Sequence, residues 1–130
     1  MIKILLDTNA YAALMRGHSE TARLVRSAER LFLSPIVAGE LMFGFRNGAR
    51  YEQNLKEFEE FSRNPFVEFI PVTLTTADRF SRIALALKRK GSPIPSNDIW
   101  IAAQAMETGA DLLSFDRHFD SIDGLVWISP

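Results

Sequence analysis

Short apolar runs alternate along this chain with longer segments that carry helical patterns. The first run, residues 2–6, is rich in Ile and Leu and is too short for a helix, so it predicts a buried strand. Further strands are predicted at residues 31–33, 67–72, 111–114 and 125–128. Such alternation is typical of α/β proteins, in which helices cover both faces of a mainly parallel sheet. We therefore expect an α/β fold, a three-layer α/β/α sandwich.

The helices between these strands are marked by residues that commonly begin helices. Ser34 precedes a proline and has the form of an N-cap. Thr75, with Asp78 three residues later, resembles a capping box, and Ser96 or Asn97 can cap the helix that follows. The predicted helices span approximately residues 9–16, 20–30, 35–48, 50–63, 75–90 and 97–109.

The length of 130 residues predicts a single domain that spans residues 1–130. The chain has no Cys, which excludes disulfides and thiolate metal sites, and its two His argue against a histidine-rich zinc site. The net charge is −1, whereas nucleic-acid-binding proteins are commonly basic. An acidic metal site would itself lower the charge, so this argues only mildly against a nucleic-acid substrate. No segment reads as a secretory signal or a membrane span, so we expect a cytoplasmic protein.

Four carboxylates stand in apolar surroundings: Asp7, Glu40, Asp98 and Asp116. Asp7 ends the first apolar run and Asp116 follows the strand predicted at 111–114, while the other two lie inside apolar helical segments. Ligands of parallel sheets gather beyond the carboxyl ends of the strands, so we expect these acids to share one edge. Carboxylates brought together repel one another unless a cation compensates. The group therefore predicts a cation site.

An oxygen-only set of ligands suits a hard ion such as Mg²⁺ or Mn²⁺. Phosphate oxygens of a substrate would complete the coordination shell, which favours phosphoryl chemistry. Each acid also has a structural interpretation: Asp7 can cap a helix, Asp98 can favour a helix dipole, and Asp116 can begin a turn. Glu40 could form a salt bridge with Arg46 or another Arg. The joint interpretation is the stronger one, because it explains all four acids at once.

Four motifs around these acids resemble those of a PIN-domain ribonuclease, and together they are similar to the VapC-type toxins of toxin–antitoxin pairs. The motifs are LLDTN at residues 5–9, SPIVAGEL at 34–41, NDIWIAA at 97–103 and LLSFDRHF at 112–119. The resemblance spans nearly the whole chain, with the motifs in order. It implies that the four acids form a catalytic, metal-binding site for Mg²⁺ or Mn²⁺.

The resemblance also implies supporting roles for polar neighbours of the acids. Thr8 or Asn9 would orient Asp7, Ser114 would hydrogen-bond within the site, and Asn97 precedes the third acid. Three arginines follow the motif segments and are expected to contact substrate phosphate at the mouth of the site: Arg16, Arg46 and Arg117. Two further candidates lie near the last motif. Asp120 could extend the metal site through water, although an Asp in such a place more often caps a turn. His118 could touch substrate phosphate, but we interpret it as a surface histidine.

The expected partners are an RNA substrate and a cognate antitoxin, with a homodimer and a toxin–antitoxin hetero-oligomer as assemblies. Residues 41–45 and an apolar stripe along residues 51–61 hold more large apolar groups than one helix face needs. Both can fill the core, but the resemblance adds a groove for the amphipathic segment of an antitoxin. We hypothesise that some of these Phe side chains are exposed in the free monomer.

Two other functions remain compatible with these residues. One is a phosphatase or phosphoacceptor domain that uses Asp7 as its nucleophile, although the chain lacks a second acid two residues later. The other is a non-catalytic binding module with the same fold. The complete set of four acids argues against the second.

Overall fold

The computed structural model describes residues 2–130, and within them five parallel strands form one sheet in the order β3-β2-β1-β4-β5. The strands are β1 (Lys3–Leu6), β2 (Arg30–Leu33), β3 (Val67–Phe69), β4 (Asp111–Leu113) and β5 (Trp127–Ile128). The first strand of the chain is the central one, with β2 on one side and β4 on the other. This topology brings the carboxyl ends of β1 and β4 side by side, although more than 100 residues separate them in the sequence.

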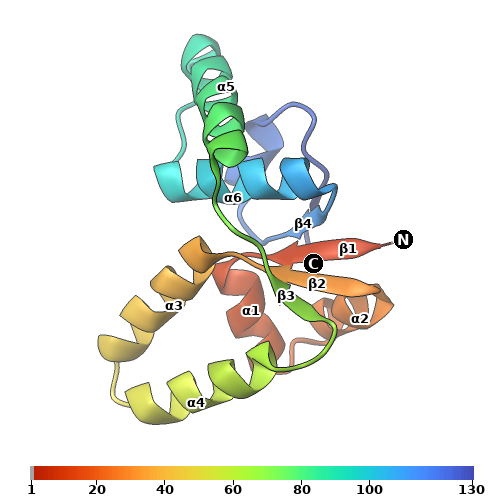
Figure 1. Ribbon diagram of the computed structural model, residues 1–130, viewed down its shortest axis with the longest axis vertical. Helices are drawn as coiled ribbons and strands as arrows, with labels where there is room; N and C mark the ends of the chain where they lie inside the picture. Colours follow the sequence, from red (N-terminus) through yellow and green to blue (C-terminus); the bar gives the residue numbers. More distant parts are fainter. Residues whose placement is uncertain (1) are drawn as a thin grey trace.

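Helices cover both sides of the sheet, which confirms the predicted three-layer α/β/α fold (Figure 1). On one side α6 (Ser96–Thr108) crosses the strands, and α5 (Leu74–Lys90) packs on α6 and extends away from the sheet. The other side holds α1 (Thr8–Met15), α2 (Ser19–Ser27), and a hairpin of α3 (Pro35–Arg46) and α4 (Tyr51–Ser62). No helix within residues 2–130 combines the length and the apolar character needed to cross a bilayer.

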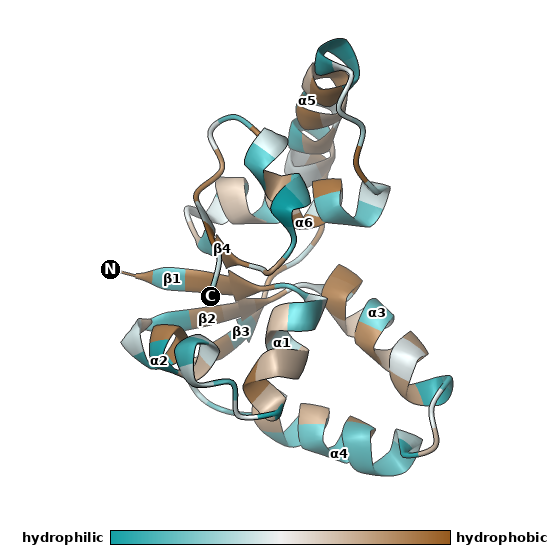
Figure 2. Ribbon diagram, turned by 180° about the vertical axis from the view of Figure 1, so that it is seen from behind, coloured by the Kyte–Doolittle hydropathy of each residue, from teal (hydrophilic) through white to brown (hydrophobic). Residues whose placement is uncertain are grey.

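The three central strands are apolar on both faces, because helices cover each of them from both sides (Figure 2). Leu5, Leu6, Leu31, Leu33 and Leu112 are completely buried. Removing a side chain of this size from water contributes about 1.5–3 kcal/mol, so these strands anchor the sheet. The edge at which they end is consequently a rigid platform for whatever side chains follow them.

A buried glutamine joins the two helical layers close to that edge. Gln104 on α6 is completely buried, and its amide N–H groups donate to the carbonyls of Ile70 and Pro71 at 3.1 and 3.2 Å. Its carbonyl oxygen accepts a hydrogen bond from the hydroxyl of Ser34. The same hydroxyl oxygen caps α3 by accepting from the N–H of Ile36 at 3.0 Å. Gln104 therefore ties the start of α3 to the end of β3.

The start of α5 differs from the sequence prediction. Its capping box consists of Thr73 and Thr76, whose hydroxyl oxygens each accept from the other residue's backbone N–H, at 3.4 and 3.0 Å. The predicted pair of Thr75 and Asp78 was wrong, since both residues lie inside the helix. Thr73 rather than Thr75 has the extended backbone of an N-cap, with φ −118° and ψ −179°.

Two other helix boundaries also differ. The N-cap of α6 is Pro95, and neither Ser96 nor Asn97 has that role. A proline fits there because its carbonyl accepts the first helical bond, while the N–H that it lacks is not needed at an N-cap. The helix predicted at 20–30 ends at Ser27, because the N–H of Glu29 already donates to the carbonyl of Ile2, directly before β1, at 2.9 Å.

The two edge strands are shorter than predicted, with β3 ending at Phe69 and β5 beginning at Trp127. An edge strand pairs on one side only, and the bonding of this segment to β2 ends where the N–H of Ile70 donates to the carbonyl of Leu33 at 3.0 Å. A short 3₁₀ helix, η1 (Arg117–Ser121), follows β4 and was not predicted. It begins directly after Asp116, which places it beside the candidate site.

Candidate active site

A cleft of about 430 Å³ lies at the carboxyl ends of β1 and β4, and all four predicted acids line it. The lining residues are Asp7, Thr8, Asn9, Glu40, Pro95, Ser96, Asn97, Asp98, Ile101 and Asp116. Among the residues that the structure describes, no Lys or Arg lines the cleft. Its walls therefore carry four carboxylates without a neighbouring fixed cation.

Asp7 is the most buried of the four acids, with 7% of its surface exposed. It is the N-cap of α1, where one carboxylate oxygen accepts from the N–H of Ala10 at 2.9 Å. The other oxygen accepts from the hydroxyl of Ser114. Burial raises the pKa of Asp7 from 3.8 to about 6, with smaller contributions from the charges of Asp98 and Asp116. The charged form of Asp7 is therefore less favourable here than in water, and a bound cation would compensate this cost.

Ser114 connects the ends of β1 and β4. It is completely buried, and its hydroxyl oxygen accepts from the N–H of Asp116 at 2.9 Å while its hydrogen is donated to Asp7. Its carbonyl accepts from the indole N–H of Trp127 at 2.9 Å, which attaches β5 to the same edge. One serine thus holds two of the acids in register, as the resemblance implied for a hydroxyl at this position.

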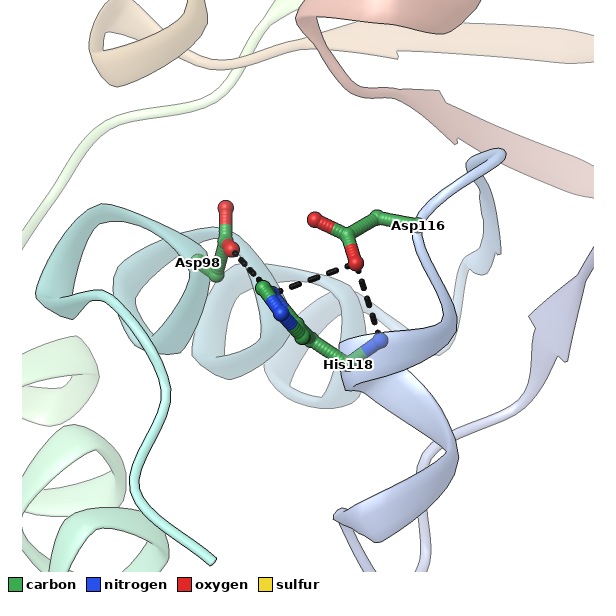
Figure 3. A group of neighbouring side chains, drawn as sticks. All are labelled: Asp98, Asp116 and His118. Atoms are coloured by element: carbon green, nitrogen blue, oxygen red, sulfur yellow. Dashed lines mark hydrogen bonds and ion pairs between the residues drawn. The ribbon is translucent and has the colours of Figure 1, made fainter.

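Asp98 and Asp116 face each other across His118, as Figure 3 shows. Nδ1 of His118 lies 3.6 Å from Oδ2 of Asp98 and 3.2 Å from Oδ1 of Asp116. Partial burial raises the pKa of Asp98, and the nearby charge of Asp116 raises it further. His118 had been interpreted as a surface histidine. Its side chain is 53% exposed, but its Nδ1 belongs to the acidic group.

Glu40 is held by two neutral donors from different segments. The hydroxyl of Thr8 donates to Oε1 at 2.5 Å, and the amide of Asn97 donates to Oε2 at 3.3 Å. The alternative pairing of Glu40 with Arg46 was wrong, since the guanidinium of Arg46 lies 4.5 Å from the ring centre of Tyr51. The role expected of Thr8, orienting Asp7, is also corrected, because its hydroxyl is committed to Glu40.

Residues 4–125 match the sequence model of the PIN domain. Ribonuclease VapC2 of Haemophilus influenzae strain Rd is 32% identical over 129 residues, which cover 96% of each chain. This chain belongs to the PIN-domain family of VapC ribonucleases. The assignment confirms the family that the four sequence motifs predicted.

Solved structures share the fold of this PIN domain closely. VapBC-1 from nontypeable Haemophilus influenzae has a TM-score of 0.87 at 28% identity, with 98% of each chain covered. VapBC2 from Rickettsia felis, bound to a DNA fragment from its promoter, has a TM-score of 0.88 at 22% identity, with 99% of each chain covered. At that lower identity the likeness establishes the fold alone.

The structural interpretations of three acids turn out to be compatible with their place in the PIN cleft. Asp7 caps α1, Asp98 lies in the first turn of α6, and Asp116 caps η1 by accepting from the N–H of His118 at 2.9 Å. Each role leaves the carboxylate at the cleft wall, because α1, α6 and η1 all begin at this cleft. Asp98, Asp116 and His118 each offer a ligand atom within 4.8 Å of the others, which is consistent with a metal site.

The three predicted phosphate-binding arginines lie outside the lining of the cleft. Arg16 is the C-cap of α1, at the opposite end of that helix from Asp7, and Arg46 is the last residue of α3. Arg117 begins η1 directly after Asp116, so it is the nearest of the three along the chain. Asn9 and Asn97 both line the cleft. A phosphate contact by any of these arginines stays a prediction.

Proposed function

We propose that this PIN-domain protein is a metal-dependent endoribonuclease that hydrolyses phosphodiester bonds of RNA, with residues 1–130 as its single nuclease domain. The observation that carries the proposal is the cleft, in which Asp7, Glu40, Asp98 and Asp116 meet without a Lys or Arg among the described lining residues. Its likeness to ribonucleases VapC of Haemophilus influenzae supports RNA as the substrate.

The donor set fits Mg²⁺ or Mn²⁺. Carboxylate oxygens are the ligands that these ions prefer, and Asp7 and Asp98 both have raised pKa values that a bound cation would offset. Such a cation would polarise the scissile phosphate and lower the pKa of a water molecule. Asp7, Asp98 and Asp116 would hold it, because they converge from β1, α6 and the end of β4.

Glu40 has a different environment from the three aspartates. Thr8 and Asn97 hold both of its oxygens with neutral donors, so its orientation is set without neutralising its charge. We assign to Glu40 the positioning of the attacking water, or of a cation together with the aspartates. In-line attack of water at phosphorus would leave a 5′-phosphate and a 3′-hydroxyl.

The details of the site make an aspartate-based phosphatase or phosphoacceptor less suitable. Asp7 lies beside Asp98 and Asp116, whose charges would repel an incoming phosphoryl group unless a cation compensates them. Among the described residues, no lysine lines the cleft to stabilise a phosphoryl group. A non-catalytic module would have little reason to gather four acids at one site.

We further propose that the protein is a toxin that forms a homodimer and a hetero-oligomer with a cognate antitoxin. Related structures such as VapBC-1 of Haemophilus influenzae support this, since their names describe VapBC pairs. A groove beside the cleft is lined by Pro35, Ile36, Gly39, Glu40, Phe43 and Asn97. Phe43 is 71% exposed there, whereas Phe58 on α4 is buried and fills the core. The hypothesis of exposed Phe side chains thus concerns Phe43 rather than the stripe on α4.

The test of the nuclease is cleavage of total RNA in Mn²⁺ by the intact chain and by Asp98→Asn, with mapping of the fragment ends. We expect Asp98→Asn to fold normally and to lose at least about a hundredfold in cleavage rate. Asp78→Asn, which alters an exposed acid on α5, is the matched control and should cleave like the unmodified protein. Cleavage that persists in excess chelator would contradict the role of the metal.

A further inference from the structure

The imidazole of His118 lies against the two acids that come from different parts of the chain (Figure 3). Asp98 is in the first turn of α6, and Asp116 follows β4. Nδ1 of His118 is 3.2 Å from an oxygen of Asp116 and 3.6 Å from an oxygen of Asp98. One ring nitrogen therefore faces both carboxylates at once, which a histidine directed only at solvent would not do.

These distances are close to those between neighbouring ligand atoms around a metal ion. Octahedral ligands about 2.1 Å from an ion stand roughly 3.0 Å from their nearest neighbours. The two contacts of Nδ1 are 3.2 and 3.6 Å long, and ligand atoms of all three residues lie within 4.8 Å of one another. Small side-chain rotations would bring the three atoms onto one face of such a shell.

The backbone holds His118 in this place. Its N–H donates to Oδ1 of Asp116 at 2.9 Å, so the histidine and the acid share one turn of η1. The N–H of Asp116 is in turn bonded to the buried hydroxyl of Ser114 at 2.9 Å. The next residue, Phe119, is 1% exposed and anchors η1 in the core. His118 is consequently carried by a fixed turn, and only its side-chain torsions remain free.

We propose that His118 is a nitrogen ligand of the cation at this site and makes it a mixed oxygen and nitrogen centre that prefers Mn²⁺ to Mg²⁺. The inference rests on the proposed metal-dependent function and specifies which ion the site selects. Mg²⁺ prefers oxygen ligands, whereas an imidazole nitrogen adds more to the binding of transition-metal ions. The alternative is that His118 only forms ion pairs with the two acids and leaves when the cation binds.

The test uses Mn²⁺ itself as the probe, on the full chain freed of metal by chelation and dialysis. Electron spin echo modulation of bound Mn²⁺ reports directly coupled ¹⁴N nuclei, and the chain has just two histidines, His18 and His118. We expect imidazole modulation in the unmodified protein and its loss in His118→Asn. Selective ¹⁵N-histidine labelling should change the same signal.

The matched control is His18→Asn, which should keep the modulation. His18 lies at the start of α2, where its Nδ1 accepts from the backbone N–H of Thr21 at 3.3 Å, and asparagine is itself a good N-cap. His118→Asn should melt like the unmodified protein in chelator, because the side chain is about half exposed and the hydrogen bond from the backbone N–H of residue 118 to Asp116 survives.

Affinity gives a second readout that does not depend on RNA cleavage. We expect His118→Asn to weaken Mn²⁺ binding about tenfold or more, measured from the signal of free Mn²⁺. Mg²⁺ binding, measured by competition, should change less than about threefold. Mn²⁺ that binds the unmodified protein without imidazole modulation, or equal losses for both ions, would overturn the role of His118 and leave the metal site intact. Failure of Mn²⁺ to bind the unmodified protein would instead overturn the proposed metal site itself.

Discussion

Replacing Asp7 by asparagine should stabilise the metal-free protein at neutral pH, although it removes a residue of the proposed active site. Asp7 is 7% exposed, and its burial raises its pKa from 3.8 to about 6. At pH 7.5 the folded protein must hold this buried carboxylate in its charged form, near Asp98 and Asp116. Asparagine has nearly the same shape and carries no charge.

The magnitude follows from the pKa. The pKa of Asp7 rises from 3.8 to about 6 on folding, which corresponds to about 3 kcal/mol of stability. The protein has this stability below pH 4, where Asp7 is protonated, and loses it as the pH rises through 6. Asparagine has a single acceptor oxygen, so it can keep only one of the two bonds that Asp7 accepts from Ala10 and Ser114, a loss of about 1 kcal/mol. The free energy of unfolding of Asp7→Asn should therefore exceed that of the unmodified protein by about 2 kcal/mol at pH 7.5. At pH 4 most of this penalty is absent, and the variant should be the less stable one by about 0.5 kcal/mol.

The assay is urea denaturation followed by circular dichroism, in excess chelator, at several pH values between 4 and 7.5. Asp78→Asn is the control, because that acid is exposed on α5 in a surface pair with Arg82, so its effect should stay within about 0.5 kcal/mol. Saturating Mn²⁺ should stabilise the unmodified protein, by about 2.7 kcal/mol at a hundred times its Kd, and should stabilise Asp7→Asn much less. A variant that is less stable than the unmodified protein at pH 7.5 in chelator, or a difference that is independent of pH, would refute the reasoning.

Two further predictions concern the fold and its surface. Gln104→Met preserves volume but leaves the hydroxyl of Ser34 and the carbonyl of Ile70 without this partner, so the free energy of unfolding in urea should fall by about 2–4 kcal/mol. The control Gln53→Met, at an exposed position, should change it little, and equal unfolding midpoints for the two variants would contradict the role of Gln104 in joining α3 to β3. Phe43→Gln should leave stability unchanged but weaken self-association, measured by sedimentation velocity, roughly tenfold, because an exposed aromatic side chain would be lost from the interface. An unmodified protein that is monomeric and binds no hydrophobic dye would rule out an interface at Phe43.

Cap residues at the start of α3 and acids at the ends of strands could be predicted because they are local features. The run at residues 2–6 and the proline after Ser34 identify a strand and a helix start from a few neighbouring residues. The same local rules placed the capping box of α5 two residues late. Thr73 and Thr75 are equally good caps in isolation, and the course of the chain after β3 decides between them.

The sequence by itself determined the class of fold, the strands and helices in order, and the four acids that are candidates for the metal site. These depend on apolar periodicity and on residue types, which act over a few positions. Only the tertiary structure decided that β4 pairs with β1, so that Ser114 reaches Asp7 across 107 positions of sequence. Equally apolar strands are interchangeable until packing selects their order. The place of His118 between Asp98 and Asp116 was decided in the same way, because a contact between a 3₁₀ turn and a distant helix leaves no periodic trace in the sequence.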